Sequence, residues 1–277
     1  MTERAQPGQR STTGAVAERR EGRALLAVAS LLLLLLLGIP LFALVRAAAP
    51  AEVAARLGDP LVLSALRLSL VTSGIATLVC VLLGLPLAYL LARHRFPGAA
   101  AVDTLIDLPM TMPPVVAGVA LLLTFGRVGL LGRHLEAAGV QVAFSTLAVV
   151  LAQTFMAAPF FVRAARAGFE AVPLSLEQAA MTLGRNRWGV FWTISVPLAA
   201  PALGAGAVLC WARALSEFGA TMMFAGNRPE VTQTLPLAVM SAMETNLQLA
   251  ITISLLSLLL AFGALAGVRL LVRRWGR

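Results

Sequence analysis

Six apolar stretches, each about as long as a lipid bilayer is thick, constrain this chain more than any other feature of its sequence. They are Ala24–Val45, Leu68–Leu91, Leu108–Phe125, Val142–Val162, Ala199–Phe224 and Leu247–Val268. About 20 apolar residues in helical conformation cross a membrane. Hydrophobic residues make up 59% of the 277 residues and charged residues only 13%, a composition that excludes a water-soluble domain. The sequence therefore predicts an all-α, polytopic membrane protein with six transmembrane helices.

The arginines orient the predicted bundle. They precede the first stretch, follow the second and the fourth, and end the chain: Arg4, Arg10, Arg19, Arg20, Arg23, Arg93, Arg95, Arg163, Arg166, Arg185, Arg187, Arg273, Arg274 and Arg277. The opposite loops hold fewer, so both termini and the 163–197 segment are expected in the cytoplasm of an inner (plasma) membrane protein. We expect a disordered cytoplasmic leader at 1–23, a transmembrane domain at 24–272 and a cytoplasmic tail at 273–277.

The same arginines are spread over loops and termini, which argues against nucleic acid as the partner behind the net charge of +9. No catalytic constellation and no metal site is visible, because His94 and His134 stand in basic loops without nearby ligand residues. Cys80 and Cys210 lie in apolar stretches and are expected to be packing residues. We therefore expect no cofactor and no enzymatic activity of the chain alone.

A polar segment between the fourth and fifth stretches, 174–184, is predicted to form a short helix that docks onto a partner. Ser175 is expected to cap it, with Gln178 completing a capping box, and Gly184 is suited to a left-handed stop. Four residues spaced at i, i+3, i+4 and i+7 would form one small apolar face: Leu176, Ala179, Ala180 and Leu183. The alternative is an amphipathic helix on the membrane surface.

This segment resembles the EAA loop of ATP-binding-cassette (ABC) importer permeases, through the Ala179-Ala180 pair, Leu183-Gly184 and the later Pro197. The usual Glu of that loop falls at Gln178, with Glu177 one position earlier. The resemblance implies a type I importer fold whose cytoplasmic coupling helix binds a separate ATPase. The coupling residues would be Leu176, Glu177, Gln178, Ala179, Ala180, Leu183 and Gly184. It also implies a homodimer, two ATPase subunits and one periplasmic or lipid-anchored binding protein.

Polar residues inside the apolar stretches are the candidates for a translocation path. Arg213 and Glu217 stand at i and i+4, so they can neutralise one another, either holding helices together or facing the substrate. Asp107 is expected to pair with an arginine of another stretch. Pro113 and Pro114 either break the third helix beside a cavity or simply begin it.

The outer end of the fifth stretch is a candidate gate. Small residues there, Gly219 and Thr221 among them, allow helices to approach closely. Met222, with the neighbouring Phe224, is suited to seal such a gate, although packing alone would use the same residues.

The substrate class comes from a second resemblance. The 213–221 run, Arg-Ala-Leu-Ser-Glu-Phe-Gly-Ala-Thr, and the following 224–237 loop are similar to the molybdate and tungstate permeases among ABC importers. The sequence departs from them at Glu230, where Gly is common, and at Met240, where Tyr is common. Sulfate or thiosulfate is the nearest alternative substrate. An ion-driven secondary transporter, an intramembrane enzyme and a non-transporting scaffold are the alternatives outside this class.

Overall fold

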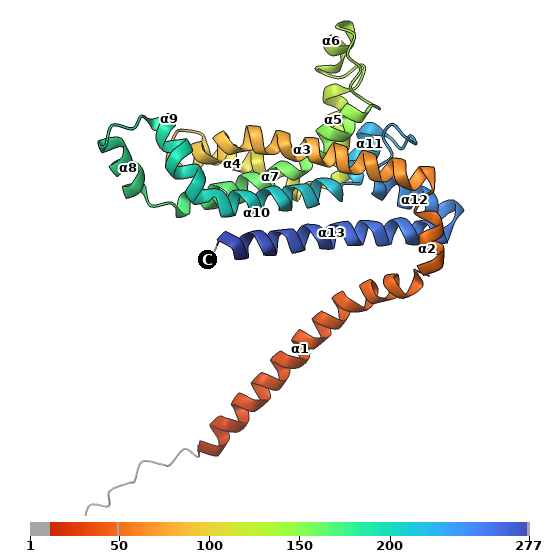
Figure 1. Ribbon diagram of the computed structural model, residues 1–277, viewed down its shortest axis with the longest axis horizontal. Coiled ribbons are helices and arrows are strands. Elements are labelled where there is room, and N and C mark those ends of the chain that lie inside the picture. The colour runs from red at the N-terminus through yellow and green to blue at the C-terminus, as the bar shows by residue number, and fades with distance from the viewer. Residues whose placement is uncertain (1–11, 49, 276–277) are drawn as a thin grey trace, which may run out of the picture. The chain divides into compact units, whose positions relative to one another are not determined.

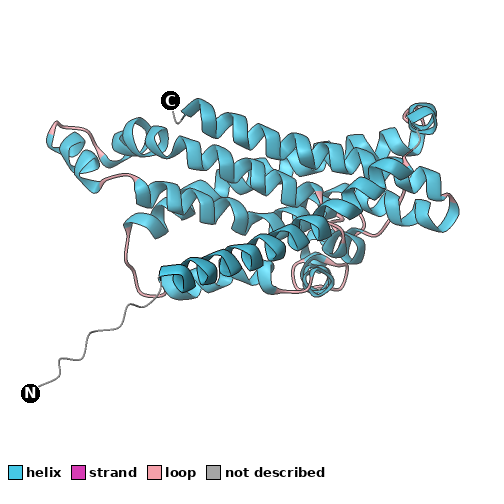
Figure 2. Cartoon of the chain, turned by 90° about the horizontal axis from the view of Figure 1, so that it is seen from below, coloured by secondary structure: helices cyan, strands magenta, loops and turns pink. Residues whose placement is uncertain are grey.

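The computed structural model describes residues 12–48 and 50–275, in which helices are joined by turns and loops and no strand occurs (Figures 1 and 2). The chain divides into two units, Met1–Ala49 and Pro50–Arg277. The all-α class predicted from the sequence is confirmed.

The first unit contains one long helix, α1 (Thr12–Ala47), whose apolar part Leu26–Ala47 is long enough to span a membrane. The predicted span began at Ala24, but the helix begins at Thr12. Alanine, glutamate and arginine between these positions favour helix and extend it backwards. The helix thus extends into the segment expected to be a disordered leader, of which residues 1–11 lie outside the described residues.

The second unit holds the remaining helices, of which the shorter ones connect the long ones. In chain order they are α2 (Pro50–Arg56), α3 (Pro60–Arg93), α4 (Ala99–Thr111), α5 (Pro114–Phe125), α6 (Gly132–Ala137), α7 (Thr146–Ala171), α8 (Leu174–Thr182), α9 (Arg187–Val190), the π-helical turn η1 (Phe191–Ser195), α10 (Val196–Leu215), α11 (Gly219–Ala225), α12 (Leu235–Thr245) and α13 (Leu247–Trp275). Figure 1 shows α8 and α9 at one end of this unit, and α11 and α12 at the opposite end.

The core of the second unit lies where α3, α7 and α10 run side by side, with α13 packed against α10 and α12 (Figure 2). Phe161 and Phe169 of α7 are fully buried there. Cys80 of α3 and Cys210 of α10 are buried in the same cluster, in the packing positions expected of them. Glycines let the helices approach closely: a side chain at Gly84 would overlap Phe161.

Two of the six predicted spans are interrupted. The predicted third span is divided between α4 and α5, which are bent by 116° at a short break. The fifth begins earlier than predicted, at Arg187, and ends at Leu215, so that Phe224 belongs to the separate helix α11. The described residues thus contain five helices able to span a membrane, or six if the bent pair counts as one span. Pro114 occupies the first turn of α5, where its missing N–H costs nothing.

Candidate functional site

The helix α8 occupies the segment predicted to dock onto a partner. It begins at Leu174 after Pro173, and no side chain caps it, so Ser175 lies in its first turn. The predicted cap and capping box are therefore wrong. Its end agrees with the prediction, because Gly184 has a φ of +87°. The backbone N–H of Arg185 donates to the Ala180 carbonyl at 3.1 Å and that of Gly184 to Met181 at 3.0 Å, the bonding pattern of a Schellman stop.

A buried ion pair fixes α8 to the bundle. Arg93, at the end of α3, donates from Nε and Nη2 to Glu177 Oε1 at 3.0 and 2.8 Å, and both side chains are only 7% exposed. Ser195 Oγ of η1 donates to the same oxygen at 2.8 Å. Arg93 Nη2 also donates to the Val172 carbonyl at 2.9 Å. One carboxylate thus joins α8 to α3 and to η1.

The contact between Arg93 and Glu177 was not predicted from the sequence. The available signal was that both residues belong to the arginine-rich side of the predicted bundle, which limits the candidate partners to that end. The spacing along the chain gives no further indication of the contact.

The residues predicted to form one apolar face of α8 are divided between an inward and an outward side. Glu177 and Ala180 are turned inward, at 5% and 9% exposed. Leu176 is 47% exposed and Leu183 86% exposed, and Gln178 and Ala179 are exposed beside them. Ala180 is therefore not part of the outward face. Leu176 and Leu183 form a patch of exposed apolar side chains of the kind that marks a protein interaction surface, whereas the exposed Leu174 and Met181 stand about 180° away around the helix axis.

Two more ion pairs link α4 to α7. Arg163 Nε donates to Asp107 Oδ1 at 2.6 Å, with a second contact between Arg163 Nη2 and Asp107 Oδ2. Arg166 Nη1 lies 2.5 Å from Asp103 Oδ1 and its Nε lies 2.7 Å from Glu170. The expectation that Asp107 pairs with an arginine of another stretch is confirmed.

The prolines and the small residues singled out in the sequence meet where α5 contacts α11. A Cβ added to Gly219 would lie 2.8 Å from Pro114 Cβ. One added to Gly118 would lie 2.7 Å from Met223 Cβ and 2.8 Å from the Ala220 carbonyl. These contacts leave no space for a larger residue. The two interrupted spans therefore touch at the residues that follow their breaks.

The Arg213–Glu217 pair forms, but not along one continuous helix. Glu217 lies in the break after α10, its side chain is 1% exposed, and its Oε2 is 2.6 Å from Arg213 Nη2. Its other oxygen accepts from the Ala220 backbone N–H at 2.9 Å and so caps α11. This geometry favours the interpretation that the pair holds α11 to α10. Nearby, Thr221 is fully buried with no hydrogen-bond partner for its hydroxyl.

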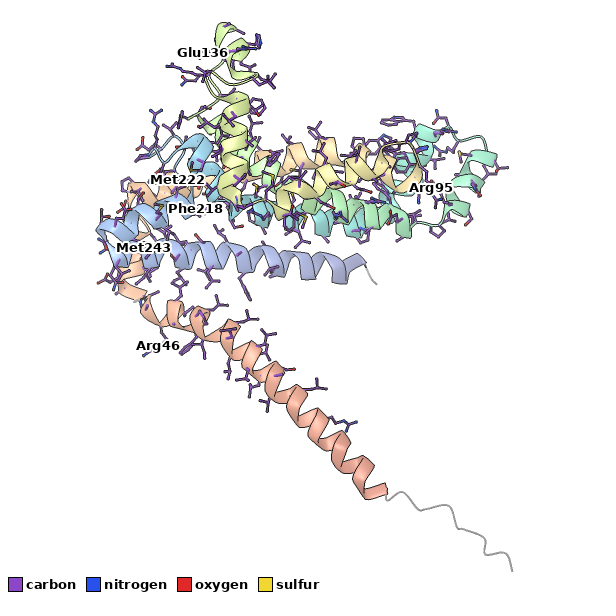
Figure 3. All side chains as sticks on the ribbon, turned by 180° about the vertical axis from the view of Figure 1, so that it is seen from behind. Arg46, Arg95, Glu136, Phe218, Met222 and Met243 are labelled. Atoms are coloured by element: carbon purple, nitrogen blue, oxygen red, sulfur yellow. The ribbon has the colours of Figure 1, made fainter. Side chains whose placement is uncertain are left out.

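The candidate gate residues lie at the end of the second unit opposite to α8. Figure 3 shows Phe218, Met222 and Met243 there, far from Arg95. Phe218 is 39% and Met243 63% exposed, and Met222 is half-buried. Phe224, a candidate seal in the sequence, is instead fully buried in the core of α5, α7 and α11.

The loop between α11 and α12 closes on itself through polar side chains. Gln233 Nε2 donates to Asn227 Oδ1 at 2.9 Å, and Asn227 Nδ2 donates to Ser241 Oγ at 2.8 Å. Glu230 has a φ of +64°, in the left-handed region that favours glycine. This explains why glycine suits the position at which the sequence departs from the permeases it resembles. In the part of the chain that the structure describes, no group of three His, Cys, Asp or Glu residues gathers as metal ligands would.

Residues 81–277 match the family described as "Binding-protein-dependent transport system inner membrane component". The chain is 46% identical over 205 residues to the "Molybdenum transport system permease protein ModB" of Mycobacterium tuberculosis, covering 74% of this chain and 78% of the relative. It is 39% identical over 258 residues to a "Probable molybdenum ABC transporter permease protein" of Haloferax volcanii, covering 93% of this chain and 92% of the relative.

A solved structure with a similar fold is a bacterial ABC transporter involved in the import of the acidic polysaccharide alginate. The TM-score is 0.77 at 15% identity, and the match covers 95% of this chain and 99% of that chain. The MetNI methionine ABC transporter matches with a TM-score of 0.58 at 19% identity, over 76% of this chain and 94% of that chain. These likenesses concern the fold.

Proposed function

This chain belongs to the binding-protein-dependent transport system inner membrane components, and we propose that it is the permease subunit of an ATP-driven importer of molybdate or tungstate. The observation that carries the substrate class is the 46% identity to a molybdenum permease over three quarters of the chain. A permease selects its ion only weakly, because a site that bound the anion tightly would not release it. The separate binding protein therefore makes the main selection.

The coupling helix in this proposal is α8. Its exposed residues Leu176, Gln178, Ala179 and Leu183 contact a cleft on the ATPase subunit, which hydrolyses ATP in place of this chain. Glu177, Ala180 and Gly184 act differently. The first two face the bundle and the third ends the helix, so they position the docking surface and do not form it.

The translocation path forms between two copies of the chain, each bound to one ATPase, with one periplasmic or lipid-anchored binding protein on the outer side. Pro113, Pro114, Gly219, Thr221 and Met222 build the wall or gate at the α5–α11 contact. The unpaired hydroxyl of Thr221 and the exposed side chains next to it support this assignment, since polar groups within a membrane segment normally face protein or a water-filled path. Arg213 and Glu217 hold this wall in place.

In this proposal both termini and α8 lie in the cytoplasm, which the clustering of arginines on that side supports. Reporter fusions after Arg95 and within 163–187 are expected to read cytoplasmic, and fusions near Arg133 and Pro229 periplasmic. A periplasmic reading for the 163–187 segment would refute the proposal, because no ATPase could reach α8.

Uptake into vesicles tests the substrate. The chain is reconstituted with its ATPase inside and its binding protein outside, and labelled molybdate is followed with and without ATP. We expect ATP-dependent uptake in which tungstate competes at low concentration and sulfate competes weakly. Preferential uptake of sulfate would reassign the chain to the sulfate permeases. Uptake driven by an ion gradient without ATP would assign it to the secondary transporters.

A further inference from the structure

An open groove of about 580 Å³ runs along the second half of α3 and ends beside α8 and η1. Its wall is almost entirely apolar: Val81, Leu82 and Leu85 come from α3, and Met181, Trp188 and Phe191 from the opposite side. Tyr89 packs edge-on against Phe191, with ring centroids 4.8 Å apart, and so closes the floor of the groove. We propose that this groove binds one anionic phospholipid of the leaflet on the α8 side.

The length of the groove fits one lipid chain. Its α3 wall extends from Val81 to Leu90, which is about 14 Å at about 1.5 Å per residue. Half of the hydrocarbon core of a bilayer is about 15 Å. A groove that reaches from the end of a membrane span to about the middle of the bilayer therefore accommodates an acyl chain of one leaflet. A soluble peptide would have no access to such a surface within the membrane.

The open end of the groove carries the charge that a lipid phosphate requires. Arg93 and Glu177 both line it, but they neutralise each other in the buried pair described above. Arg187 remains exposed at this end, and the structure shows no salt bridge to it within the described residues. The end of the groove is thus cationic beside an apolar wall. Basic pockets of this kind between transmembrane helices bind anionic lipid headgroups.

Two tryptophans indicate that the membrane boundary lies at the open end of the groove. Trp188 is 68% exposed and Trp192 47% exposed, and both line the groove. Exposed tryptophans concentrate at the headgroup level, where the ring is partly in lipid and its N–H remains in water. Arg95, labelled in Figure 3, lies at this end of the bundle as well. The apolar wall therefore lies in lipid and the arginine at the headgroups.

Native mass spectrometry of the purified, detergent-solubilised chain tests the proposal without reference to the transported ion. Phosphatidylglycerol or phosphatidylcholine is added at equal concentrations, and bound lipid is counted. We expect tighter binding of phosphatidylglycerol, and a roughly fivefold loss of that affinity in Arg187→Gln, since one arginine near the headgroups contributes about 1 kcal/mol. Arg133→Gln, which removes an exposed arginine far along the chain from the groove, is the charge-matched control and is expected to have no effect.

A second pair of variants tests the acyl chain. Leu82→Trp fills the groove and is expected to weaken both lipids, whereas Leu83→Trp, at a similarly exposed neighbour outside this groove, is expected to weaken neither. Equal binding of the two lipids, or no change in Arg187→Gln, would overturn the proposal. So would a Leu82→Trp chain that binds lipid normally but no longer copurifies with a second copy or the ATPase, because the groove would then be a protein interface.

Discussion

The strongest prediction concerns Glu177, whose Oε1 accepts three hydrogen bonds in a buried position. Glu177→Ala removes the acceptor and leaves the guanidinium of Arg93 buried. Loss of one partner of a buried ion pair costs about 3 to 5 kcal/mol. Arg93 keeps its bond to the Val172 carbonyl and lies beside an open groove, so the lower end of this range applies. At 2 to 4 °C per kcal/mol, the apparent melting midpoint should fall by about 6 to 12 °C.

The chain offers a control for this variant. Arg127 and Glu136 form an ion pair of the same 2.8 Å separation, but their side chains are 71% and 40% exposed. Exposed pairs contribute about 1 kcal/mol or less, so Glu136→Ala should lower the midpoint by no more than about 4 °C. Glu177→Gln keeps an acceptor oxygen but loses the charge, so its melting midpoint should lie between those of Glu177→Ala and Glu136→Ala.

The two buried cysteines provide the assay. Cys80 and Cys210 are the only cysteines of the chain and both are buried in the core. A thiol-reactive fluorescent dye therefore reports the opening of the bundle on heating in detergent. If Glu177→Ala lowers the midpoint no more than Glu136→Ala does, the buried pair does not stabilise α8 against the bundle and the reasoning fails.

Three further predictions use other parts of the structure. Gly184→Val should cost about 1 to 2 kcal/mol through its positive φ alone, since nothing lies within 4 Å of the added Cβ. Less ATPase should copurify with Gly184→Val than with the unchanged chain, whereas Gly184→Asn should keep most of it. If equal amounts of ATPase copurify with both variants, the left-handed end of α8 is not needed for docking. Glu217→Ala should lower the amount of folded protein in the membrane, and Arg213→Leu with Glu217→Leu should partly restore it; normal abundance and uptake in Glu217→Ala would contradict both roles of the pair. Glu230→Gly should raise the melting midpoint by about 2 to 4 °C, because it relieves a left-handed residue at a cost of about 1 kcal/mol, and a lower midpoint would refute this.

The long helices could be predicted because a continuous apolar run of sufficient length forms a helix across the membrane. Leu68–Leu91 lies wholly within α3, and Leu247–Val268 wholly within α13. The break at Met112–Pro113 was visible as a proline signal, but the bend of 116° was not. A proline in the first turn is compatible with both a straight start and a sharp turn, and packing against α11 decides between them.

The candidate site was predictable in its residues and not in its contacts. The pairing of Asp107 with an arginine followed from the cost of an isolated charge in the membrane, but the choice of Arg163 depends on how α4 lies against α7. In α8, periodicity identified the apolar positions without showing which side faces the bundle. The carboxylate of Glu177 accepts hydrogen bonds from Arg93 and Ser195 inside the bundle, and these bonds decide the orientation of α8. Glu177 therefore faces inward, together with Ala180.

The glycine contacts between α5 and α11 have a mechanical consequence. Because Gly118 and Gly219 bring the two helices too close for either to slide past the other, α5 and α11 can be displaced only as one rigid piece. The helical hydrogen bonding is interrupted just before each of them, at Met112–Pro113 and at Ser216–Phe218. The two interruptions lie on the same side of the paired helices, because Gly219 contacts Pro114. Any rearrangement that starts at α8 and travels along α7 or α10 would therefore reach this end as a single swinging movement, and not as two independent ones.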